Sequence, residues 1–263
     1  MTAKVFAYTE SIDVANAVGQ YILKQQDKAF NNGEDKFKIA MSGGSLGKVL
    51  KKSLIENSEI APKIKWDKWE VYFSDERIVP LDHEDSNYGL FNEMVLKNLP
   101  SSTPKPKVFT IDEKLVTGKD GQVEGADIQK DKDIAKQYEN VLPKQFDVIL
   151  LGCGPDGHTC SLFPDHHLLN ERTELVSYIN DSPKPPPRRI TITFPVLENA
   201  KSIAFVAEGS GKAPILKQIF NDPNSRLPSK LVNEIKSGVE INWFVDSSAV
   251  DGVDGIDVLN SKI

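Results

Sequence analysis

Short apolar runs alternate along this chain with segments in which apolar residues recur at helical spacing. Turn residues bound each run, a pattern that predicts buried strands. Between the first two runs, Ile12, Ala15, Val18 and Ile22 indicate one of the intervening helices. The repeated alternation predicts an α/β fold of three layers, a mostly parallel, Rossmann-like sheet flanked by helices in one domain over residues 1–263. The predicted strands are 4–8, 37–41, 66–73, 108–111, 146–151, 175–179, 190–193, 203–207 and 241–245.

Two segments depart from this pattern. Residues 113–130 are charged, contain glycines and carry few apolar side chains, so we expect an exposed insertion there. A helix is predicted to follow over 134–142. Residues 246–263 repeat Asp, Gly and Ser, which predicts a mobile C-terminal tail.

Composition and charge exclude several classes of protein. Hydrophobic residues make up 39% of the chain and charged residues 27%, which suits a buried core with a solvated surface. The net charge is −6 and no basic block stands out, so we expect no nucleic-acid partner. Neither an N-terminal apolar run nor a membrane-length one occurs, so we expect no membrane partner and a cytoplasmic location.

Cysteine and histidine usage does not indicate a metal site. Cys153 and Cys160 are too few for a disulfide framework or a zinc site, and we interpret them as small buried residues. His166 and His167 are adjacent, but no third ligand stands at a suitable spacing. We therefore predict no metal.

One loop combines a buried strand with residues that can do chemistry. After the apolar run 146–151, the chain breaks into glycines, among them Gly154, together with Asp156 and His158. Glycines let a ligand approach the backbone closely, and ligands bind at the carboxyl ends of strands in open α/β sheets. Imidazole titrates near neutral pH, which makes His158 the candidate general base.

The same loop matches a dinucleotide-binding fingerprint. Residues 152–157 fit the pattern G-x-G-x-x-G after a strand. That fingerprint requires a long helix that begins at its third glycine. Pro164 follows Gly157 too closely for such a helix. We therefore disfavour nicotinamide binding.

A second Gly-rich turn follows the strand 37–41. It stands between that strand and a predicted helix, so free backbone amides and the positive end of the helix would face an anion, and two hydroxyls favour phosphate. A tight turn without a ligand is the plainer interpretation. Residues 43–47 also read G-x-S-x-G, the nucleophile elbow of serine hydrolases, with Asp75 or Asp156 and His158 downstream. The residues of the predicted anion site are Ser42, Gly43, Gly44 and Ser45.

Charged residues stand at the ends of other predicted elements. Asp75, Glu76 and Arg77 follow a strand and should face the same crevice as the Gly-rich loops. A solvated cluster of charges is the alternative for them.

Three further cations are candidate phosphate ligands. A proline-rich loop precedes Arg188 and Arg189, which are either exposed charges or anion ligands. Lys212 stands at the start of a helix, where a cation is unfavourable unless an anion is bound. This misfit supports a phosphate site.

Together these motifs resemble 6-phosphogluconolactonase. The resemblance covers most of the chain in the right order and is most specific around His158. The charged insertion resembles the fungal SOL branch of that family, and the wider superfamily includes glucosamine-6-phosphate deaminases. The matching segments are 42–45, 75–77 with 79–80, 86–88, 152–159 with 161–164, 189–191 and 211–212.

The resemblance implies hydrolysis of 6-phospho-D-glucono-1,5-lactone to 6-phospho-D-gluconate in the pentose phosphate pathway, without metal or organic cofactor. His158 would be the general base, Asp156 would orient it, and Arg77 would hold the substrate or the developing oxyanion. We expect a monomer whose partner is this small sugar-phosphate lactone. The residues expected to bind the substrate or its phosphate are Ser42, Gly43, Gly44, Ser45, Asp75, Gly154, Arg189 and Lys212.

Two alternatives stay open. The deaminase pattern has a glutamate five residues after the loop histidine and an aromatic residue after Asp-Glu, where this chain has Phe163 and Arg77. Both departures favour the lactonase. The other alternative is a non-catalytic fungal paralogue with a role in RNA metabolism, against which the presence of His158 and Arg77 argues.

Overall fold

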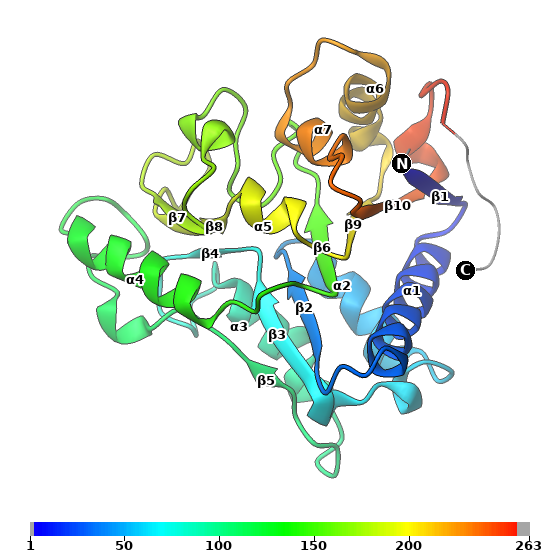
Figure 1. The fold of residues 1–263 in the computed structure, drawn as a ribbon, viewed down its shortest axis with the longest axis horizontal. Coiled ribbons are helices and arrows are strands. Elements are labelled where there is room, and N and C mark those ends of the chain that lie inside the picture. Colours follow the sequence, from blue (N-terminus) through cyan, green and yellow to red (C-terminus); the bar gives the residue numbers. More distant parts are fainter. Residues whose placement is uncertain (1–2, 257–263) are drawn as a thin grey trace.

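A parallel sheet forms the centre of the molecule (Figure 1). The computed structural model describes residues 3–256. Over these residues the sheet has seven strands in the order β1-β10-β9-β6-β2-β3-β5, and each hydrogen-bonded pair runs parallel. The predicted α/β class is confirmed. The bounds are β1 Lys4–Tyr8, β2 Phe37–Met41, β3 Trp69–Phe73, β5 Lys107–Val108, β6 Val148–Gly152, β9 Ser202–Ala207 and β10 Glu240–Asp246.

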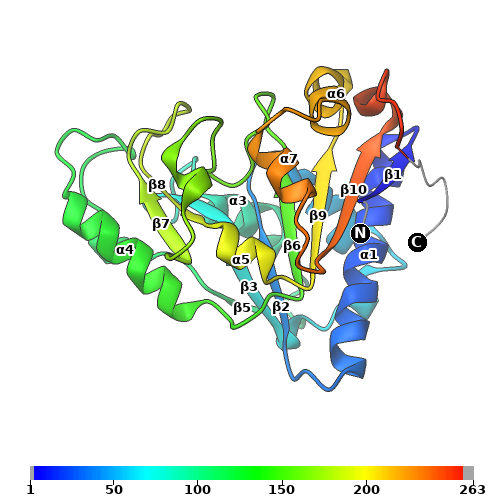
Figure 2. The ribbon, with the colours of Figure 1, turned by 45° about the horizontal axis from the view of Figure 1, so that its top comes forward.

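Helices cover both faces of this sheet (Figure 2). Val148 and Leu150 of β6 belong to one core cluster, and Ile149 and Leu151 to the other, because successive strand side chains point to opposite faces. None of the described helices combines the length and apolar content needed to cross a membrane. One layer holds α1 (Ser11–Asn31), α2 (Leu46–Leu50) with the π-helical Lys51–Glu56, and α3 (Asn87–Met94), and the other holds α5 (Phe194–Glu198), α6 (Ala213–Asn221) and α7 (Pro228–Asn233).

Three strands form a separate antiparallel sheet beside the first. They are β4 (Asp75–Arg77), β8 (Arg189–Ile192) and β7 (Val176–Ile179), hydrogen-bonded in that order. Helix α4 (Ile128–Val141) packs against them through a small apolar cluster (Figure 1). The sequence pattern did not separate these strands from the parallel sheet, because an apolar run predicts a strand but not its partner.

The charged segment before α4 contacts other parts of the fold. Helix α4 begins earlier than predicted because the Asp127 side chain accepts hydrogen bonds from the backbone N–H groups of Gln129 and Lys130. Residues 113–127 are mostly exposed, but Gly121 is buried and lies against Pro186. The segment therefore touches the proline-rich loop.

The C-terminal segment is folded further than predicted. A 3-10 helix, Ser247–Val250, follows β10, and Asp246 caps it by accepting from Ala249 N at 2.8 Å. Ala249 is fully buried, and Val253 and Ile256 pack on the core. Residues 247–256 thus contact the rest of the fold, and 257–263 lie outside the described residues.

Candidate active site

The strand order brings the two Gly-rich loops together. Within the parallel sheet, the strand that follows β2 in the chain is β3, on one side, whereas the strand that follows β6 is β9, on the other side. Because β2 and β6 are neighbours, their carboxyl ends form a topological switch point, where ligands bind in such sheets. The turn 42–45 and the loop with His158 begin there.

A cleft of about 160 Å³ opens at these strand ends. Its walls come from the loops after β2, β6 and β9 and from β4 and β8 of the small sheet. All predicted site residues except Asp156 line it. The cleft-lining residues are Ser42, Gly43, Gly44, Ser45, Asp75, Arg77, Gly152, Cys153, Gly154, His158, Thr159, Cys160, Arg189, Val206 and Lys212.

His158 is held from two sides. Its Nδ1 lies 2.5 Å from Asp156 Oδ1, and its ring packs on Phe163 with the centroids 4.9 Å apart. Gly154 makes room for this arrangement, since a Cβ at that position would fall 2.0 Å from Nδ1. With Nδ1 engaged by the carboxylate, Nε2 is the ring nitrogen that remains for proton transfer.

The surroundings adjust the pKa values of this pair. Burial lowers the pKa of His158 below its ordinary value, while the hydrogen bond and charge of Asp156 oppose that shift. Burial would raise the pKa of Asp156, but its hydrogen bond with His158 and the contact with Lys184 lower it below the ordinary value. An ionised Asp156 beside an unprotonated His158 is the arrangement that a general base requires.

Two arginines are neighbours on adjacent strands of the small sheet. Arg77 of β4 and Arg189 of β8 are paired residues in the antiparallel register, and both line the cleft. Burial and then the charge of Arg77 lower the pKa of Arg189 to about 10. Among the described residues, no acceptor bonds the buried Nε of Arg77. Like charges opposite one another are unfavourable, so the pair is suited to an anion.

The neighbouring Arg188 has a different role. It is fully buried and binds Asp131 of α4, with Nε 2.8 Å from Oδ2 and Nη2 2.5 Å from Oδ1. Its Nη1 also donates to the carbonyls of Thr117 and Gln122, in the charged segment. Arg188 therefore anchors that segment, and Arg189 is the arginine at the cleft.

The turn after β2 and Lys212 complete the cleft. Ser42 and Ser74 share a hydrogen bond of 2.7 Å, and Gly43 must lack a side chain because a Cβ would fall 1.9 Å from Asn87 Oδ1. Ser45 is exposed just before α2. Lys212 Nζ donates to the Cys153 carbonyl at 2.6 Å, which brings this cation from the β9 loop to the His158 loop.

Sequence reasoning missed several supporting residues. Asn87 and Ser161 both bind the carboxylate of Asp75, at 3.3 and 2.8 Å. Both stood in segments that carried the family resemblance, which was the available signal. Lys184, whose Nζ lies 3.2 Å from Asp156 Oδ1, carried no signal in the sequence beyond its proline-rich loop. Cys153 and Cys160 are buried, as predicted.

The dinucleotide alternative lacks its helix. No helix begins at Gly157, and the next helical turn in the described chain is the 3-10 segment His167–Asn170. Among residues 3–256, no group of three His, Cys, Asp or Glu side chains is arranged to hold a metal ion.

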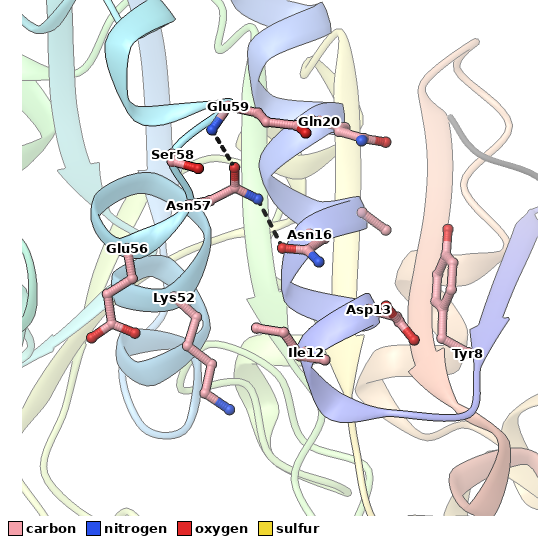
Figure 3. Close-up of a pocket in the computed structure, with 11 residues that line it drawn as sticks. Tyr8, Ile12, Asp13, Asn16, Gln20, Lys52, Glu56, Asn57, Ser58 and Glu59 are labelled. Atoms are coloured by element: carbon pink, nitrogen blue, oxygen red, sulfur yellow. Dashed lines mark hydrogen bonds between the residues drawn. The ribbon is translucent and has the colours of Figure 1, made fainter.

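A wider hollow of about 640 Å³ lies elsewhere, between α1 and the segment after α2 (Figure 3). Part of its polar lining is already hydrogen-bonded within the protein. Asn57 donates to the Asn16 side chain at 2.8 Å and accepts from the Glu59 backbone N–H at 2.9 Å. Its lining residues include no histidine, cysteine or arginine. The smaller cleft, which is lined by His158 and three cationic side chains, is therefore the candidate active site.

Comparisons with known proteins show the family of this chain. Residues 9–243 match the family described as glucosamine-6-phosphate isomerases/6-phosphogluconolactonase. 6-Phosphogluconolactonase 3 of Saccharomyces cerevisiae is 46% identical over 93% of this chain and 95% of its own, and 6-phosphogluconolactonase of Homo sapiens is 38% identical over 93% and 92%. The crystal structure of 6-phosphogluconolactonase from Leishmania guyanensis has the same fold, with a TM-score of 0.80 at 24% identity over 97% of this chain and 100% of that one. The chain belongs to the glucosamine-6-phosphate isomerase/6-phosphogluconolactonase family.

Proposed function

We propose that this protein hydrolyses 6-phospho-D-glucono-1,5-lactone to 6-phospho-D-gluconate, the lactonase step of the pentose phosphate pathway. The observation that carries the proposal is the His158–Asp156 pair beside a cleft lined by Arg77, Arg189 and Lys212. A histidine base suits attack of water on a lactone carbonyl, and a cluster of cations suits a phosphate. The relatives named 6-phosphogluconolactonase support the same substrate.

The chemistry needs one base that works twice. Nε2 of His158 accepts a proton from water as the water oxygen bonds to C1 of the lactone. The C1–O5 ring bond then breaks, the imidazolium returns this proton to O5, and the new carboxylic acid loses its proton to solvent. Asp156, at 2.5 Å from Nδ1, orients the ring and stabilises the imidazolium between the two transfers.

Cations and amides in the cleft have two tasks. Arg77 would hold the substrate or stabilise the negative charge that develops on the carbonyl oxygen, with help from loop amides near Gly44 and Gly154. Phosphate binding at a distance from C1 would fix the lactone against His158, so positioning contributes to the rate. The residues assigned to the phosphate are Ser42, Ser45, Arg189 and Lys212.

The other family activity fits this chain less well. Phe163 packs on the imidazole where the deaminase pattern has a glutamate, and Arg77 lines the cleft where that pattern has an aromatic residue. We expect the enzyme to act in the cytoplasm as a monomer, without nucleic acid or membrane partners and without a cofactor.

The general-base assignment is tested with His158→Ala. We expect kcat to fall by about 10²–10⁴-fold with little change in KM, because binding groups stay in place. His167→Ala removes an exposed histidine that does not line the cleft and should keep wild-type activity. A folded His158→Ala enzyme with most of its activity would overturn the assignment, and an acyl adduct on Ser45 in quenched turnover would transfer the role of nucleophile to that serine.

A further inference from the structure

Lys184 reaches the catalytic pair from another part of the chain. It belongs to the proline-rich loop between β7 and β8, and its Nζ lies 3.2 Å from Asp156 Oδ1. The same oxygen lies 2.5 Å from Nδ1 of His158. One carboxylate oxygen is thus shared by an imidazole and an ammonium group.

The backbone of Lys184 is fixed in a way that an ordinary surface lysine is not. Its N–H donates to Ser182 Oγ at 3.2 Å, and its carbonyl accepts from Ser182 Oγ and from Arg189 Nη2, both at 2.8 Å. Arg189 itself lines the cleft. The side chain of Lys184 is only one-third exposed, so the ammonium group lies beside Asp156 on a backbone that is held in place.

The shared carboxylate has an electrostatic consequence for His158. A carboxylate beside an imidazole makes it more basic, and an adjacent ammonium group cancels part of that effect. Burial and Lys184 lower the pKa of His158, whereas Asp156 and Asp75 raise it. The charged groups that face the imidazole or line its cleft are Asp156 from its own loop, Lys184, Asp75 and Arg77 from β4, Arg189 from β8, and Lys212 from the loop after β9.

We propose that Lys184 is a positioning residue that, through Asp156, keeps His158 unprotonated and ready to accept the proton of the attacking water at neutral and mildly acidic pH. The proposal rests on His158 being the general base. The same ammonium group favours the second transfer, because an imidazolium with a partly neutralised partner releases its proton to the leaving O5 more readily.

The test is the pH profile of kcat/KM for 6-phosphogluconolactone with Lys184→Met. We expect the acidic limb to move to higher pH by about 0.5–1 unit, since removal of a nearby positive charge raises the pKa of the imidazole. Activity on the alkaline plateau should stay within about 3-fold, because His158 is then unprotonated in both proteins. Lys184→Arg keeps the charge and should restore the wild-type limb.

Two controls separate this effect from others. Lys217→Met removes one exposed positive charge on α6 and should leave the limb unchanged. NMR titration of the His158 ring in wild type and Lys184→Met should show the same shift without any turnover.

Two outcomes would contradict the proposal. If neither the acidic limb of kcat/KM nor the NMR titration of His158 changes, Lys184 does not act on His158, and the general base stays as assigned. A loss of activity that is equal at every pH would assign Lys184 to substrate contact instead. Failure of the proposed function would appear separately, as a wild-type protein without activity on 6-phosphogluconolactone.

Discussion

His158 belongs to a closely packed loop. Asp156 holds one ring nitrogen, Phe163 supports the ring face, and Gly154 lies so close that no side chain fits there. The imidazole therefore has little freedom to leave the orientation in which Nε2 is available. At this scale the contacts could be predicted from the sequence, because the loop residues stand within a few positions of one another, and their types suggest a general base. The contribution of Lys184 was not readable, since it depends on a contact between segments far apart in the chain.

Gly154→Ala should test how much the packing around His158 contributes. The new Cβ would lie 2.0 Å from Nδ1, so the ring must move. We expect kcat to fall by about 10–100-fold while the protein stays folded, because a displacement of about 1 Å at a reacting group costs rates of that order. Gly211→Ala is the matched control, since a Cβ there meets no atom within 4 Å. Wild-type kcat in Gly154→Ala would show that the ring tolerates displacement.

Element pairing decides where the arginines lie. The sequence predicted that Asp75, Glu76 and Arg77 follow the end of a strand, and β3 does end at Phe73. These three residues, however, form a strand of their own, β4, which pairs with β8. This pairing puts Arg77 opposite Arg189, more than a hundred positions later in the chain. No local pattern specifies such a register, because the three residues of β4 are all charged and carry no alternation of apolar and polar side chains.

Glu76 connects β4 to helix α3, and its carboxylate is buried. Its side chain accepts from the backbone N–H groups of Arg77, Asn87 and Tyr88 and from the hydroxyl of Ser86. Burial raises the pKa of Glu76 from 4.5 to about 7, although these hydrogen bonds oppose the shift. A raised pKa in the folded state means that protonated Glu76 contributes stability that is complete below pH 4.5 and is lost as the pH rises through about 7.

The predicted pH dependence can be isolated with Glu76→Gln, which stays neutral at every pH. The free energy of unfolding of wild type relative to this variant should fall by about 3 kcal/mol between pH 4.5 and 8, measured by urea denaturation. Glu84→Gln changes an exposed carboxylate in the same segment and should show almost no such trend. A difference that stays constant with pH would mean that the hydrogen bonds to Glu76 fully offset its burial.

The whole molecule places one cleft between two sheets. Lys212 and the His158 loop come from the parallel sheet, whereas Arg77 and Arg189 come from the antiparallel one. A parallel sheet was predictable, since an alternation of strands and helices leads to a sheet whose loops gather at one edge. The second sheet was not, and with it the distance between Arg189 and Lys212 in the fold could not be inferred from the chain. The anchoring of the small sheet by Arg188 and Asp131 was likewise hidden, because two charges far apart in sequence give no sign of being buried together.

Arg189 and Lys212, one from each sheet, should together select the phosphorylated lactone. Lys212 donates to the Cys153 carbonyl and keeps further donors, while Arg189 also binds the carbonyls of Pro186, Lys184 and Pro185. Lys212→Met should therefore cost on the order of 2–4 kcal/mol in kcat/KM for 6-phosphogluconolactone and little for plain gluconolactone. Arg189→Met should lower both values, since its carbonyl bonds hold the loop, but it should lower the phosphorylated one more. The informative quantity is the ratio of the two kcat/KM values, with Lys217→Met as the charge control. If both variants keep the wild-type ratio, the phosphate binds elsewhere in the cleft.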